Sequence, residues 1–216
     1  QQSNHVHRIM KANPAHAGLT RREKKKVLTS RGLPLAEDFG ALRHTGPGTI
    51  HVDRKVTVSG KGSVRLDTPA SLGTKNPTNR NYATPEIIRP LDREDLREYN
   101  RFSVWVYVDA PGVYLTFAGF TLYNEGEKIM PTPGRFEGQH FETVYPNKWQ
   151  HIIWEIPDLY RDCVTGFSVN IMLAGAPAGD SERMSLYIDD MRIEKVEAEN
   201  SRGFVLRCDV MAYCHS

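Results

Sequence analysis

The sequence has few cysteines and no long apolar run, and each absence excludes a class of protein. Three cysteines occur in 216 residues, and no two of them form a C-x-x-C pair. A disulfide-rich scaffold and a zinc ribbon are therefore excluded, and the thiols are expected to be buried or free. No stretch approaches the about 18 consecutive apolar residues of a membrane helix, and no apolar h-region follows Gln1. We expect no membrane span.

Charge of one sign is also lacking. The formal net charge is +2, and much of the basic excess comes from the run 21–26. Outside that run nothing favours nucleic acid as a partner. The 13 prolines and 17 glycines indicate many turns, which favours short strands over long helices.

Residues 1–34 are polar and basic, and we interpret them as an N-terminal arm. Thr20 followed by Glu23 has the spacing of a capping box, and Gly32 with Pro34 closes a helix. The pattern predicts a short surface helix over residues 21–31, with a solvated basic face.

From residue 35 to residue 197 the pattern has period two, and it predicts one all-β domain. The expected fold is an antiparallel β-sandwich of the jelly-roll type, because short strands are separated by turn residues and no βαβ rhythm occurs. A helical turn is expected at 92–99, and long loops at 72–84 and 125–141. The expected strands are 49–58 with a break at Asp53, 63–67, 86–89, 102–108, 114–122, 151–156, 167–173 and 185–196.

The two ends of the chain leave alternatives open. A start at Gln1 fits either a mature protein without its signal peptide or a trimmed chain. Residues 198–216 resemble a linker and one apolar extended run, which must be paired or covered. We favour the first strand of a following domain, while docking on this sandwich is the alternative.

Several segments, in order, resemble galactose-binding-like jelly rolls that form N-terminal modules of large secreted bacterial glycoside hydrolases. They are GSVRLD at 62–67, YNRFSVWVY at 99–107, WQHIIWEIPDL at 149–159, TGFSV at 165–169 and YIDDMRIE at 187–194. The resemblance implies a carbohydrate-binding-module-like accessory domain that is secreted, periplasmic or at the cell surface. Its implied partners are an oligo- or polysaccharide and the catalytic domain of the same parent protein.

Alternation places Trp105 and Tyr107 on one face of the strand 102–108, opposite the core side chains. Aromatic rings beside polar groups suit sugar binding, because a ring packs on the apolar face of a pyranose. The same alternation suggests that Glu155 and Asn170 join this face, although the sheet order is open. The alternative is that the face is covered by loops or by the arm.

In the resembling modules a structural calcium ion often joins the two ends of the domain. The resemblance therefore implies a calcium site built from Glu37 and Asp38, before the first strand, with Asp189 and Asp190 in the last. The alternative is a solvated turn or capping role for these acids.

Catalysis has weak support in the sequence. The acids Glu142, Glu155, Asp158 and Asp162 show no local signature of a glycosidase pair. Gln139, His140 and Tyr145 suggest lyase-type proton abstraction, and the alternative is a plain loop. We expect a non-catalytic module. The alternatives are a jelly-roll glycoside hydrolase or polysaccharide lyase in its own right, and a purely structural spacer.

Overall fold

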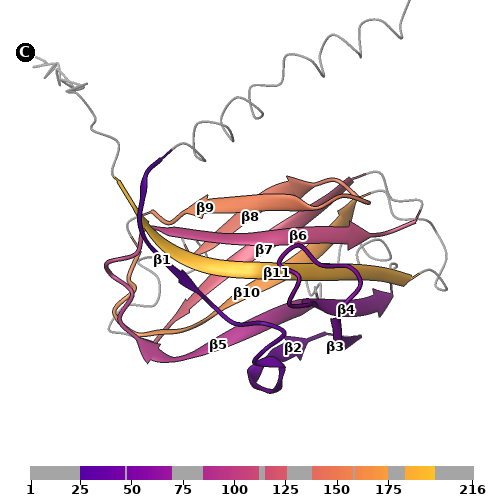
Figure 1. Ribbon diagram of the computed structural model, residues 1–216, viewed down its shortest axis with the longest axis horizontal. Helices are drawn as coiled ribbons and strands as arrows, with labels where there is room; N and C mark the ends of the chain where they lie inside the picture. Colours follow the sequence, from indigo (N-terminus) through magenta and orange to yellow (C-terminus); the bar gives the residue numbers. More distant parts are fainter. Residues whose placement is uncertain are drawn as a thin grey trace, which may run out of the picture.

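The computed structural model describes residues 25–46, 48–69, 85–111, 115–125, 138–157, 159–174 and 183–197. These residues form two antiparallel sheets that lie face to face as layers (Figure 1). The strands are β1 Val27–Gly32, β2 Arg43–Thr45, β3 Thr49–Asp53, β4 Ser63–Pro69, β5 Glu86–Glu94, β6 Arg101–Asp109, β7 Leu115–Asn124, β8 Gln139–Val144, β9 Gln150–Glu155, β10 Val164–Ala174 and β11 Arg183–Val196.

The first sheet has the order β3-β4-β11-β6-β9, and β1 pairs with the second half of β11. The second sheet has the order β2-β5-β10-β7-β8. Apart from the 3-10 turn η1 Phe39–Ala41, the described residues contain no helix. The predicted all-β antiparallel sandwich is confirmed.

The core lies between the sheets, where alternate side chains of each strand meet. Phe102 of β6 is fully buried and stacks on Phe167 of β10 with ring centroids 4.7 Å apart. Phe120 and Trp154 lie against the same ring at 6.0 and 6.5 Å. Burying several aromatic side chains together stabilises the contact of the two sheets, because each removes a large apolar area from water.

The helix predicted over residues 21–31 is wrong in its described part. Residues 27–32 are strand β1, which pairs with β11 from Val27 opposite Val196 to Gly32 opposite Arg192. Pairing with β11 overrides the local helix propensity of the capping-box pattern. Strand β11 is 14 residues long, and its second half has an edge free to pair with a further strand. Strand β1 thus lies in the first sheet although it precedes the predicted start of the sandwich at residue 35.

Three further expectations need correction. Residues 92–94 belong to β5, so the helical turn predicted at 92–99 does not form there. The loop predicted at 125–141 ends earlier, because Gln139 begins β8. Strand β3 ends at Asp53, and residues 54–58 are not part of a strand. The extended run predicted within 198–216 and the loop predicted at 72–84 lie outside the described residues.

Candidate functional site

The outer face of the second sheet carries a mixture of polar and aromatic side chains. The strand registers place Thr45, Glu86, Asn170, Gly119 and Phe141 in one row across five strands. The adjoining row contains Arg43, Ile88, Ser168, Thr121 and Gln139. Because Phe167 and Val169 of β10 are buried in the core, Ser168 and Asn170 point away from it.

Glu86 organises the polar part of this face. Its carboxylate accepts hydrogen bonds from the hydroxyl of Tyr123 at 3.0 and 3.2 Å and from the hydroxyl of Ser168 at 2.8 Å. Burial raises the pKa of Tyr123, and the charge of Glu86 adds to the shift, so the phenol keeps its proton and donates. Two donors leave acceptor capacity on Glu86, since an ionised carboxylate has about four lone-pair sites.

Asn170 is 9% exposed, and its Oδ1 atom has no hydrogen-bond partner. An unpartnered buried acceptor costs about 1–3 kcal/mol, so a donor supplied by a ligand would remove that cost. The space for this side chain exists because residue 119 is glycine. A Cβ atom on Gly119 would lie 2.4 Å from Oδ1 of Asn170.

Aromatic rings flank the polar groups on the same face. Phe141 of β8 is 43% exposed, and Phe117 and Tyr123 of β7 are half-buried. An acceptor without a donor, a carboxylate, hydroxyl groups and an exposed ring together suit a ligand with many hydroxyls and an apolar ring face. We call Glu86, Tyr123, Ser168, Asn170 and Phe141 the second-sheet site.

Trp105 and Tyr107 lie on the outer face of the first sheet, so they do not share a face with Asn170. Trp105 stacks on His151 with centroids 4.8 Å apart and planes at 15°. Tyr107 lies between Trp149 at 5.6 Å and Tyr187 at 5.5 Å. Ring faces that contact neighbouring rings are less open to a pyranose, which favours a packing role for this row.

Glu155 lies on the same sheet face as Trp105, four residue pairs along the β6–β9 ladder, or about 13 Å. Lys25 donates to its carboxylate at 2.8 Å, and the buried Arg101 lies 3.4 Å away. Partial burial opposes ionisation, but these two cations hold the pKa of Glu155 below its usual range. The carboxylate joins a network of ion pairs rather than the second-sheet site.

The acids of the expected calcium site are only partly brought together. Glu37, Asp189 and Asp190 line one pocket, whereas Asp38 pairs with Arg89 at 2.7 Å. The carboxylate of Asp189 accepts five hydrogen bonds from Thr57, Val58, Ser59 and Asp190. Among the residues that the structure describes, no three His, Cys, Asp or Glu side chains are grouped to hold a metal ion. As arranged, these acids do not fit a calcium site.

The acid–base candidates have partners of their own. His140 Nε2 and Glu142 Oε1 are 2.8 Å apart, and the His140 ring stacks on Trp154 at 5.9 Å. Asp162 accepts a hydrogen bond from Asn124. Asp158 lies outside the described residues. These contacts place His140 in packing between the sheet edges.

The sequence analysis named Asn170 as a ligand-binding candidate and did not name the other four residues of the second-sheet site. Alternation along 167–173 is sufficient to place both Asn170 and Ser168 on the face opposite the core. A signal for Tyr123 was also present, because continuing the alternation of β7 past Leu122 puts it on the same face as Thr121 and Gly119. Glu86 and Phe141 required the strand pairing, which local sequence does not encode.

No protein-family model matches the chain, and no curated protein is similar to it in sequence. Similar solved structures include the family 11 carbohydrate-binding module from Clostridium thermocellum in complex with a β-1,3-1,4-mixed-linked tetrasaccharide. It has 9% identity and a TM-score of 0.50, over 78% of this chain and 96% of that one. The C-terminal family 22 module of C. thermocellum Xyn10B has 17% identity and a TM-score of 0.44, over 80% and 96%. A xylan-binding domain of family 22 has 19% identity and a TM-score of 0.44, and the match covers 77% of this chain and 93% of that one.

The part of the chain that the structure describes contains no helix with the length and apolarity needed to cross a bilayer. The two antiparallel sheets, their packing and the likeness to the family 11 module agree on the fold. The chain has the β-sandwich fold seen in the family 11 carbohydrate-binding module.

Proposed function

We propose that this chain is a non-catalytic glycan-binding module of a larger secreted polysaccharide-degrading enzyme, and that it binds an oligo- or polysaccharide on the second-sheet site. The observation that carries the proposal is the buried Oδ1 atom of Asn170, which has no hydrogen-bond partner. It lies beside a carboxylate with free acceptor capacity and an exposed phenylalanine ring.

Each part of the site has a task in sugar binding. Asn170 and Glu86 accept hydrogen bonds from sugar hydroxyls, since both present oxygen acceptors on one row. Ser168 and Tyr123 hold the Glu86 carboxylate in place. The Phe141 ring packs against the apolar face of a sugar unit. The fold supports this reading as an analogy only, because function lies in the site rather than in the sandwich.

The test is affinity for soluble polysaccharides by isothermal titration calorimetry. Asn170→Ala and Glu86→Gln are expected to weaken binding, the second by about tenfold or more, since hydrogen bonds to a charged acceptor contribute about 1.5–3 kcal/mol. Glu98→Gln is the matched control for charge, because Glu98 is 80% exposed and belongs to neither sheet face.

Other outcomes identify other functions. Loss of binding in Trp105→Ala alone would move the site to the first sheet, where Trp105 and Tyr107 remain a prediction. Absence of affinity for any glycan would favour a spacer that braces a catalytic domain. Release of reducing ends by this chain alone would make it an enzyme.

A further inference from the structure

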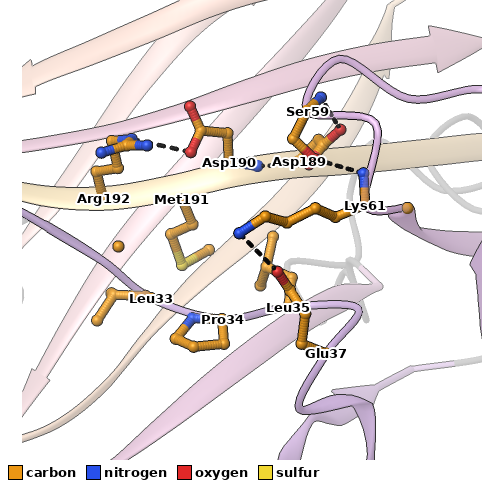
Figure 2. A pocket seen from close by; sticks show the side chains of 12 residues that line it. Leu33, Pro34, Leu35, Glu37, Ser59, Lys61, Asp189, Asp190, Met191 and Arg192 are labelled. Carbon is orange, nitrogen blue, oxygen red and sulfur yellow. Dashed lines mark hydrogen bonds and ion pairs between the residues drawn. The ribbon is translucent and has the colours of Figure 1, made fainter.

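The segment 33–37 meets the middle of β11 and the loop 59–62 around a pocket of about 360 Å³. Figure 2 shows Lys61 reaching across this pocket to Glu37, while Arg192 turns back to Asp190. The pocket thus joins residues near the start of the described chain to its last strand. This is the junction at which the resemblance implies a calcium ion.

Asp189 is saturated by protein donors. Its Oδ2 atom accepts from the Thr57 hydroxyl at 2.7 Å and from the backbone N–H groups of Val58 and Ser59 at 2.7 and 2.9 Å. Its Oδ1 atom accepts from the Ser59 hydroxyl and the Asp190 N–H, each at 2.8 Å. The five donors outnumber the lone-pair sites of a carboxylate, which are about four, so no lone pair is left for a cation.

The donors come from a loop that is held at two points. Asp53 accepts from the N–H groups of Lys55 and Val56 at 2.8 and 2.9 Å, and Asp189 then fixes the next three residues. Asp189 is 2% exposed, and the hydrogen bonds from Ser59, Thr57 and Val58 compensate for the burial of its charge. The buried charge is therefore stabilised without a counter-ion.

The remaining acids have cationic side chains as partners. Glu37 Oε1 lies 3.3 Å from the Lys61 ammonium, and Asp190 Oδ1 accepts from Arg192 Nε at 2.8 Å. Three carboxylates and two cations thus line the pocket, a net charge of −1 (−3 + 2). A calcium ion needs about 6–8 oxygen ligands, and here it would have to displace Lys61 and strip donors from Asp189.

We propose that this junction is closed without a metal ion: the Lys61 ammonium and the donors of residues 57–59 satisfy the carboxylates that a calcium ion would otherwise bind. The inference does not depend on glycan binding. It concerns how the sandwich is held together, and it makes the stability of the protein independent of calcium.

The experiment is thermal unfolding of the whole chain in millimolar calcium and in excess EDTA, together with terbium luminescence as a direct probe of metal binding. We expect midpoints that agree within about 1 °C and no saturable terbium signal. A calcium site filled at a hundred times its dissociation constant would raise the midpoint by roughly 5–11 °C for a chain of this size. Such a rise in the unaltered protein overturns the proposal.

Variants test the two halves of the proposal. Asp189→Asn is expected to lower the midpoint by the same amount in calcium and in EDTA, because it removes hydrogen bonds rather than an ion. A loss confined to the calcium sample would contradict this. Should Asp189→Asn not fold, Thr57→Val removes one donor and allows the same comparison.

Lys61→Met is expected to leave Glu37 without its cationic partner and to give the pocket a weak affinity for terbium that the unaltered chain lacks. Lys55→Met is the matched control, since it removes the same charge from the same loop away from the pocket. Equal terbium signals in the unaltered chain and Lys61→Met would show that the Lys61 ammonium does not take the place of a metal ion.

Discussion

Gly119→Ala separates ligand binding from folding. The new Cβ atom would lie 2.4 Å from Oδ1 of Asn170 and 2.9 Å from its Cγ and Nδ2 atoms, closer than real Cβ contacts. The Asn170 side chain must therefore rotate out of its place on the second-sheet site. The backbone at Gly119 has no positive φ, so alanine itself fits the strand.

The expected effects differ in size. Losing one ligand hydrogen bond costs about 0.5–1.5 kcal/mol, which weakens affinity by roughly 2- to 13-fold. Moving Asn170 from its rotamer costs about 0.5–1.5 kcal/mol, and replacing glycine by alanine returns about 0.4–1 kcal/mol through the unfolded state. The unfolding midpoint should then change by no more than about 4 °C.

The assay pairs calorimetric affinity for the best glycan with differential scanning calorimetry. Gly32→Ala is the matched control, because it also adds a methyl group to a strand and meets nothing within 4 Å. Unchanged affinity in Gly119→Ala, with the midpoint also unchanged, would refute the assignment of Asn170 to the ligand site.

Three further predictions concern stability. Phe102→Ala should cost about 3–5 kcal/mol in urea unfolding, because it removes the ring that Phe167 stacks on in the core; a loss under 1 kcal/mol would contradict this packing. A double-mutant cycle of Arg31→Met and Glu94→Gln should give a coupling of about 0.5–1 kcal/mol that salt reduces, since the pair joins β1 to β5 but is partly exposed; zero coupling would mean that it does not secure β1. The lowered pKa of Asp189 means that its contribution is present above the unfolded pKa and is lost as the pH falls through the folded pKa. In Asp189→Asn the free energy of unfolding should therefore fall less steeply below about pH 4 than in the unaltered chain. An unchanged pH dependence in this range would contradict the role given to the Asp189 carboxylate.

The central strands were predictable because burial imposes a period of two. Along β6, Phe102 and Val104 alternate with Ser103 and Trp105, and the buried set is the apolar one. Strand β8 was missed because its inward positions include the polar His140 and Glu142, while the apolar Phe141 points outward, so the alternation expected for a strand is reversed. Strand β1 was missed because Thr29 and Arg31 carry no core signal.

The site was only partly predictable for a physical reason. Alternation fixes which side of its own strand a residue takes, but hydrogen bonds between distant segments decide which strands share a sheet. Trp105 and Asn170 both point outward, yet β6 pairs with β11 and β10 pairs with β7, so they lie on opposite layers. Glu86 and Ser168 meet across 82 positions of sequence.

The most direct test of glycan binding on the second sheet is a titration followed by amide chemical shifts in ¹⁵N-labelled protein. The best-binding oligosaccharide should move the signals of Glu86, Gly119, Ser168 and Asn170. Signals of Trp105 and Tyr187 on the first sheet should stay in place. Shifts confined to the first sheet, or none at saturating glycan, would contradict the account.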